Sequence, residues 1–391
     1  MAARAAVLAT LVCACGTRTV PAAAPGPAPP APAPAALAPV LSSTTDDRSS
    51  SPPPGERPPA GPIVVLAAGD VEMARAMGRR LLREPTHDPF VTVAPLLAHA
   101  DVRFANLEGP LSEQHGETMS PTNMLIFNGP PAGADALARG GFDVVSTANN
   151  HAWDYGARGM SETLDNLDRA GVLHAGTGRT RDEAWRAAVV ERDGVRVAFL
   201  AVTDVWNFGP LAVHPAASRV AAADPAELGR AVAALRADAT LDAVIVSYHG
   251  GDEYADIPLA RARAVAHAAI DAGASAFIGH HPHVVQGIEW YGGRPVFYSL
   301  GNLLMQMHRD HAWTEFGLFA RLTIARGGAV ARAEACPFRI VGLVPRLLAG
   351  EPGRTALEGY FFGHLRAISA SAGKAHIGPP GQDGCAPVDP A

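Results

Sequence analysis

The sequence predicts a layered α/β fold, and three observations indicate it. From residue 63 to residue 278, apolar runs of strand length alternate with segments of helix length. After residue 283, apolar runs are joined by glycine turns, which is typical of antiparallel hairpins. The chain has 391 residues, of which 48% are hydrophobic, so it is long enough to bury a large core. Crossover helices followed by hairpins predict mixed sheets packed between helical layers.

The expected elements follow in order from this alternation. We expect strands at residues 63–70, 102–108, 142–147, 195–202, 243–247 and 276–278. A helix-like segment with arginines follows the first strand, and we expect further helices at residues 132–139, 159–170, 225–237 and 258–272. We expect hairpins at residues 288–298 and 317–332.

The first fifteen residues have the features of an export signal. An early arginine precedes an apolar run that is shorter than the roughly 20 residues needed to cross a bilayer, and small residues follow. The ending Val-Cys-Ala-Cys at residues 12–15 resembles a bacterial lipobox, in which Cys15 would become the lipidated first residue. An ordinary cleaved signal with incidental cysteines is the alternative. Both interpretations predict an exported protein, and the lipobox adds a lipid anchor to the membrane, facing the periplasm or the cell surface.

Composition divides the rest of the chain into three parts. Residues 16–62 are rich in proline, alanine, glycine and serine, which predicts a disordered linker because such a segment cannot bury a core. We expect a folded domain at residues 63–345, and a C-terminal helix with a flexible tail at residues 346–391. Cys336 and Cys385 can pair in an oxidising compartment, but their spacing leaves a disulfide and two separate thiols both open.

The charge balance excludes one class of partner. The chain carries 32 Lys and Arg against 38 Asp and Glu, a net charge of −6, and has no long basic block. A nucleic-acid binder typically shows a basic patch or stripe. We therefore expect no nucleic-acid partner.

Polar residues follow five of the expected strands. They are Asp70; Asn106 and Glu108; Asn149, Asn150, His151 and Asp154; His249; and His280, His281 and His283. Taken singly, most have an ordinary explanation such as a helix cap or a turn. In open α/β sheets, however, the carboxyl ends of the strands meet at one edge, where buried polar groups are costly unless a metal or a substrate compensates them. Carboxylates, amides and imidazoles together are metal ligands.

Six segments, in order and with plausible spacing, resemble the motifs of the CapA family of poly-gamma-glutamate capsule biosynthesis proteins. These segments are residues 69–75, 106–110, 148–156, 247–254, 279–284 and 297–302. The resemblance covers about residues 63 to 305, and the family is similar to the calcineurin-like metallophosphoesterases. It implies a four-layer α/β/β/α sandwich of the metallophosphoesterase type with mixed sheets, and a two-metal site at one edge of the sheets.

The resemblance also implies roles for individual residues. The implied metal ligands are Asp70, Glu108, Asn150, His249, His281 and His283. His151 would act as general acid, and Asp154 would orient it. Asn106, Arg75 and His280 are candidate substrate contacts, although a solvated Arg75 and a ligand role for His280 stay open. The implied cofactors are two divalent ions, and the ligand types suit Mn, Fe and Zn alike.

One motif departs from the family's wider relatives. Metallophosphoesterases typically carry Asp-x-His at the end of the first strand, whereas this chain has Asp70-Val-Glu72. We therefore expect one metal site to be weaker or differently ligated unless Glu72 substitutes.

Signal, spacer and motifs together predict an exported, lipid-anchored CapA-like protein. It would serve synthesis, export or attachment of an anionic capsule polymer such as poly-gamma-glutamate, with a metal-dependent site of the hydrolase type. The alternatives are a generic secreted metallophosphoesterase and a non-catalytic polymer-binding module. Enzymatic activity itself stays open, and an active protein would be a metal-dependent phosphoesterase-like hydrolase. Expected partners are the anionic polymer or a phosphoester substrate, the membrane through the lipid anchor, and membrane proteins of capsule synthesis.

Overall fold

The computed structural model describes residues 41–42, 61–305, 307, 312–373 and 375–391. All of them belong to one compact unit, Leu37–Ala391. The expected signal at residues 1–15 lies outside the described residues, as does nearly all of the expected linker at residues 16–62. Two residues of that linker nevertheless form a strand, β1 (Leu41–Ser42), which pairs with β6 in parallel.

The larger sheet begins with the first strand of the folded region. Its order is β16-β17-β14-β13-β2-β3-β4-β5, with β12 paired to β2 and β15 paired to β14. Strands β2 to β5 run parallel, whereas β13 is antiparallel to both β2 and β14, so the sheet is mixed. The strands are β2 (Ile63–Val71), β3 (Val102–Leu107), β4 (Val144–Ser146), β5 (Leu173–Ala175), β12 (Asn302–Leu304), β13 (Phe316–Ile324), β14 (Val330–Val341), β15 (Val344–Leu347), β16 (Ala375–Ile377) and β17 (Ala386–Pro390).

The second sheet has seven strands in the order β1-β6-β7-β8-β9-β11-β10. Its centre, β7 to β9, is parallel, and its β6-β7 and β10-β11 pairs are antiparallel. The strands are β6 (Ala188–Arg192), β7 (Val195–Thr203), β8 (Ala243–His249), β9 (Ala276–His280), β10 (Ile288–Tyr291) and β11 (Arg294–Phe297).

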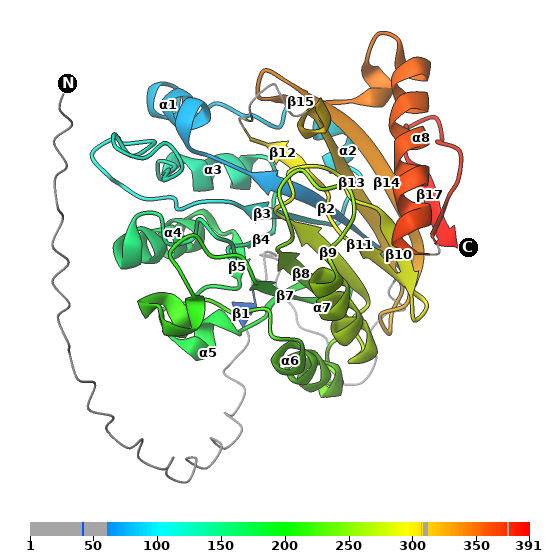
Figure 1. Ribbon diagram of the computed structural model, residues 1–391, viewed down its shortest axis with the longest axis horizontal. Coiled ribbons are helices and arrows are strands. Elements are labelled where there is room, and N and C mark those ends of the chain that lie inside the picture. The colour runs from blue at the N-terminus through cyan, green and yellow to red at the C-terminus, as the bar shows by residue number, and fades with distance from the viewer. Residues whose placement is uncertain (1–40, 43–60, 306, 308–311, 374) are drawn as a thin grey trace, which may run out of the picture. The chain divides into compact units, whose positions relative to one another are not determined.

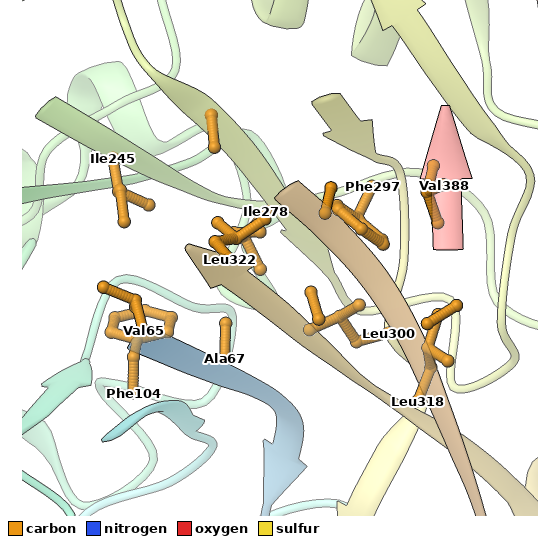
Figure 2. Close-up of a cluster of buried hydrophobic side chains, with 14 of the residues drawn as sticks. Val65, Ala67, Phe104, Ile245, Ile278, Phe297, Leu300, Leu318, Leu322 and Val388 are labelled. Carbon is orange, nitrogen blue, oxygen red and sulfur yellow. The ribbon is translucent and has the colours of Figure 1, made fainter. Parts of the chain in front are cut away.

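The two sheets pack face to face over one hydrophobic core. Figure 2 shows Val65 and Phe104 of the larger sheet opposite Ile245 and Ile278 of the smaller one, all fully buried. The rings of Phe104 and Phe199 stack across the interface with centroids 5.3 Å apart. Strands covered on both faces read as continuous apolar runs, and β2 and β8 have that pattern because every residue of β8 and all but one of β2 are buried.

Helices cover the outer face of each sheet (Figure 1). Leu81 and Leu137 pack on the larger sheet, and Val232 and Val265 pack on the smaller one. The layers therefore run α/β/β/α, which confirms the predicted fold class. The helices are α1 (Arg75–Arg83), α2 (Ala94–Leu97), α3 (Ala132–Arg139), α4 (Gly156–Ala170), α5 (Arg181–Ala184), α6 (Pro225–Ala237), α7 (Ala260–Asp271) and α8 (Arg354–Ala372). Among the described residues, none of the helices is both long and apolar enough to cross a membrane.

The C-terminal segment differs from the flexible tail expected after the last helix. β17 pairs with β14, and Cys385 forms a disulfide with Cys336 of that same strand. Phe361 and Leu365 of α8 belong to the core between the sheets. The segment thus completes the larger sheet. The local sequence, which is rich in proline, does not predict this strand. Its pairing depends on a partner strand that lies about 50 residues earlier in the chain.

Candidate metal centre

The carboxyl ends of parallel strands from both sheets meet at one place. Asp70 at the end of β2 is in register with Asn106 of β3 and with Asn302 of β12. In the other sheet, His249 ends β8 in register with His280, which ends β9. The two ends are in contact, since Nδ1 of His280 lies 3.4 Å from Oδ1 of Asp70. The convergence predicted for the strand ends is therefore present.

Five of the predicted ligands form two overlapping groups that are able to hold metal ions. Their ligand atoms lie within 4.8 Å of one another in each group, and Glu108 belongs to both; the groups are Glu108, His281 and His283, and Asp70, Glu108 and His249. Oε1 of Glu108 lies 3.9 Å from Nε2 of His283 and 4.0 Å from Nε2 of His249. All five residues are buried. A shared carboxylate between two imidazole-bearing groups is an arrangement that suits bridged divalent ions.

Two residues of this cluster have ligand atoms without a hydrogen-bond partner among the described residues. Neither carboxylate oxygen of Glu108 has a hydrogen-bond partner among the described residues, and Nδ1 of His281 likewise has none there. Burying an unpaired charged group lowers the stability of the fold by several kcal/mol, unless the pKa of the group shifts so that it becomes neutral. The residues therefore fit a metal cation, which supplies the missing partner for a carboxylate and for neutral imidazoles at once.

Two glycines allow the backbone to come together behind the ligands. A Cβ on Gly69, next to Asp70, would lie 1.9 Å from the carbonyl oxygen of Gly301. A Cβ on Gly279, next to His280, would lie 2.0 Å from the carbonyl oxygen of Tyr298. No side chain fits at such distances. Both motifs therefore require glycine at these positions, where neighbouring backbone segments approach closely.

The loop after β9 holds two of the histidines in a strained backbone. His281 has φ of 98° and His283 has φ of 58°, a region that residues with a side chain adopt at a cost. The backbone of Pro282 between them accepts a hydrogen bond of 2.8 Å from the N–H of Tyr254. Such strain persists where the surrounding structure imposes it, which is common at functional sites.

The carboxylates of the cluster differ in their pKa. Burial raises the pKa of Asp70, but contacts with His280 and His283 outweigh burial and hold the pKa well below its usual value. For Glu108, burial and the neighbouring Asp70 charge raise the pKa well above its usual value. Without a cation, the site thus favours the ionised form of Asp70 and the protonated form of Glu108.

The imidazoles differ in the same way. Burial, together with the nearby His283, lowers the pKa of His281 to about 3. Burial also acts to lower the pKa of His283, but the carboxylates of Glu108 and Asp70 outweigh it and raise the pKa to about 9. Burial lowers the pKa of His249. His249 and His281 are therefore neutral near pH 7, as metal ligands must be, whereas His283 carries a proton that a metal has to displace.

The predicted general acid lies beside the ligands with its expected partner. Nδ1 of His151 and Oδ2 of Asp154 are 2.9 Å apart, and Nε2 of His151 faces Oε1 of Glu108 at 3.9 Å. Oδ2 of Asp154 also accepts the N–H of Phe127 at 2.9 Å. Asp154 thus fixes the ring and directs Nε2 toward the cluster.

Three other predicted residues lie in the site with defined contacts. Oδ1 of Asn150, a predicted ligand, is 2.7 Å from Nε2 of His249. Asn106 and His280 are fully buried, which leaves no surface for the substrate contacts expected of them. Instead, Nδ2 of Asn106 donates to Oδ1 of Asp70 at 2.8 Å, and His280 contacts the same carboxylate. Both residues therefore hold Asp70 in place.

Glu72 and Arg75 interact with each other at the rim of the cluster. Nε of Arg75 donates to Oε1 of Glu72 at 2.8 Å. Glu72 is in neither metal-binding group among the described residues. The carboxylate in the place of the typical motif histidine thus takes part in an ion pair.

Sequence reasoning assigned no role to two residues that shape the site. Oδ1 of Asn302 lies 3.0 Å from Nδ1 of His283, and its Nδ2 donates to the His283 carbonyl, so Asn302 orients that imidazole. Phe127 stacks on the His151 ring with centroids 4.1 Å apart. Asn302 ends one of the six motif segments, which was a usable signal. The sequence around Phe127 offered no such signal, because the contact of Phe127 with His151 depends on the course of a long loop.

Comparison with known proteins agrees with these motifs. Residues 64–307 match the model of the bacterial capsule synthesis protein family PGA_cap. The chain is 31% identical over 255 residues to the capsule biosynthesis protein CapA of Bacillus anthracis, covering 64% of this chain and 61% of that one. It is 32% identical over 247 residues to the PGA biosynthesis protein CapA of Bacillus subtilis strain 168, covering 63% of each. The chain therefore spans less than two thirds of the length of these relatives.

Among solved structures, the chain is similar to a 5'-nucleotidase precursor from Thermus thermophilus. The TM-score is 0.42 with 14% identity, and the match covers 79% of this chain and 59% of that one.

Proposed function

The chain belongs to the PGA_cap family of bacterial capsule synthesis proteins, and from that premise we propose that it is an exported, lipid-anchored accessory protein of capsule polymer synthesis. In this proposal it acts on an anionic polymer such as poly-gamma-glutamate during synthesis, export or attachment, through a metal-dependent hydrolase-type site. The names of both CapA relatives support the pathway. The lipobox-like ending at residues 12–15 supports the anchor.

One observation carries the catalytic part of the proposal. Glu108 is buried with both oxygens unpaired among the described residues, and it is grouped with imidazoles from the ends of two neighbouring strands, β8 and β9, of the smaller sheet. A purely structural carboxylate in this position would be costly. Such a group is retained where it binds a cation, so the cluster is best explained as a metal centre.

The residues divide the chemistry between them. Asp70, Glu108, His249 and His281 would hold divalent ions together with His283, and bound ions of this kind activate water and stabilise charge on the attacked and leaving oxygens. Oδ2 of Asp154 keeps the proton of His151 on Nδ1, so Nε2 is the atom that exchanges protons with the substrate. As general acid, His151 would start as the imidazolium, deliver its Nε2 proton to the leaving oxygen or nitrogen, and be left neutral with its remaining proton on Nδ1.

Turnover tests the catalytic part. The purified protein is assayed on phosphodiesters and on gamma-glutamyl polymers, beside His151→Ala and the control His99→Ala, an exposed histidine remote from the motifs. We expect His151→Ala to keep its metal and lose 100-fold or more of the rate, as is typical when a general acid is removed, on the order of 10²–10⁴-fold. Equal rates in both variants would contradict the assignment of His151.

Metabolic lipid labelling tests the anchor. We expect Cys15→Ala to abolish incorporation of a labelled fatty acid, while Cys13→Ala keeps it. Incorporation lost in neither variant, or in both, would contradict a lipobox at Cys15.

A non-catalytic polymer-binding module is the second candidate, and the Glu72–Arg75 ion pair favours it. Glu72 stands where metallophosphoesterases place a histidine. Among the described residues it pairs with the Arg75 guanidinium and belongs to neither metal-binding group. A metal-loaded protein that binds the polymer without cleaving any substrate would support this candidate.

A further inference from the structure

The first motif ends in an ion pair that is anchored at both residues. Nε of Arg75 donates to Oε1 of Glu72 at 2.8 Å. The N–H of Glu72 donates to the carbonyl of Leu304, and the N–H of Arg75 donates to the carbonyl of Thr118 at 2.9 Å. Arg75 has φ of 46°, a costly backbone conformation for a residue with a side chain. The surrounding structure therefore imposes the place of this arginine.

The Arg75 guanidinium lies close enough to the metal-binding cluster for its charge to act there. Its Cζ lies 4.5 Å from the centre of the Phe127 ring, and that ring also stacks on His151. Burial raises the pKa of both Glu108 and Asp154, and the positive charge of Arg75 lowers the pKa of each by a smaller amount. These carboxylates come from two different loops. The guanidinium thus lies on the Phe127 ring, next to the predicted general acid and within electrostatic reach of two carboxylates of the site.

Arg75 still has donors to offer to a ligand. The side-chain hydrogen bond that the structure gives it within the described residues uses Nε, whereas a guanidinium has five N–H donors. Its side chain is 22% exposed, against 2% for Glu72. A partly exposed guanidinium with its Nη groups available is suited to bind carboxylate or phosphoryl oxygens.

We propose that Arg75 binds the oxyanion of the substrate, a carboxylate or a phosphoryl group, and that Glu72 is a positioning residue that holds the guanidinium beside the metal-binding cluster. This inference rests on the proposed function for the identity of the substrate site. It also accounts for the unusual first motif, because the carboxylate at position 72 then serves the arginine and not the metal.

Anion affinity and metal content are measured together in four variants. Binding of inorganic phosphate and of glutarate is determined by calorimetry, on the chelator-treated protein and after Mn²⁺ addition. The variants are Arg75→Gln, Glu72→Ala, Glu72→Gln and the control Arg79→Gln, which removes the same charge from an exposed position of the same helix. Metal content is determined by elemental analysis of each metal-loaded sample.

We expect Arg75→Gln to weaken the anion that binds wild type by roughly 10- to 100-fold with unchanged metal content, and Arg79→Gln to change little. Removal of the Glu72 charge alone would strengthen anion binding by reducing repulsion. A positioning role predicts the opposite sign, so Glu72→Ala weakens binding, and Glu72→Gln, which keeps an acceptor, recovers part of it.

Three results would overturn the inference. They are no anion binding to wild type in either state, equal affinity of Arg75→Gln and Arg79→Gln, and stronger anion binding or lost metal in Glu72→Ala. A wrong assignment of the metal centre gives a different result, namely wild-type protein that holds no metal. The dependence of anion affinity on Arg75 is then still measured in the chelator-treated protein.

Discussion

Replacing Glu108 by glutamine is expected to stabilise the metal-free protein and to destroy its response to metal. The Glu108 side chain is buried with both oxygens unpaired among the described residues. An unsatisfied buried polar group costs about 1–3 kcal/mol, and more when charged. Glu108→Gln keeps the shape and leaves a polar group unpaired, but it removes the additional cost of the charge, which we take as about 1–3 kcal/mol. At roughly 2 °C per kcal/mol for a large domain, the metal-free melting temperature should rise by about 2–6 °C.

Metal should stabilise wild type but not the variant. A ligand that binds the folded state at 100 times its Kd stabilises it by about 2.7 kcal/mol. Wild type should therefore gain about 5 °C on metal addition, whereas Glu108→Gln should not respond, because it lacks the carboxylate shared by both ligand groups. The assay is thermal unfolding with chelator and with Mn²⁺ or Zn²⁺.

The matched control is Glu113→Gln, an exposed glutamate of the loop that follows the same strand. It should shift neither melting temperature. A metal-free Glu108→Gln protein that melts at or below wild type would refute the reasoning, because Glu108 would then be a satisfied structural residue.

Three further predictions concern the site and its support. The affinity for the ion that binds His283 should rise about tenfold per pH unit up to about pH 9, because this ion displaces the proton of His283, whose pKa is raised to about 9. Calorimetry in buffers of different ionisation enthalpy measures the released proton, and a flat pH profile contradicts the prediction. Gly69→Ala should abolish metal binding, since its Cβ would meet the Gly301 carbonyl at 1.9 Å, and full metal content in a folded variant would disprove this. Replacing Cys336 and Cys385 by alanine should cost about 2–5 kcal/mol of unfolding free energy without changing metal content; unaltered denaturation would count against a structural disulfide.

The sequence was sufficient to predict the layers and the convergence of the strand ends. Apolar runs of strand length identified β2, β3, β8 and β9, and the polar residue that ends each run marked the edge where they meet. This works because parallel strands bring their carboxyl ends to one edge whatever the details of packing. Asp70 and His249 were therefore predictable as neighbours although they lie far apart in the chain.

The roles of neighbours within the cluster were not predictable in the same way. His280 and His281 are adjacent in sequence, yet His280 is fully buried beside Asp70 while His281 belongs to a metal-binding group. The difference arises from the strained backbone at His281, with φ of 98°, which no local pattern specifies. The contact between Phe127 and Arg75 depends on a long loop, and the pairing of β17 with β14 depends on strands distant in the chain. Such non-local contacts leave little trace in local sequence.

The metal content of the purified protein is the most direct test of a metal centre at the strand ends. Elemental analysis is made on wild type, Asp70→Ala and His281→Ala, with Glu113→Gln as control, after reconstitution with Mn²⁺, Fe²⁺ or Zn²⁺. We expect close to two equivalents in wild type and in the control, and a clear loss in both ligand variants. Wild type without stoichiometric metal, or ligand variants that keep all of it, would contradict a metal centre at this edge of the sheets.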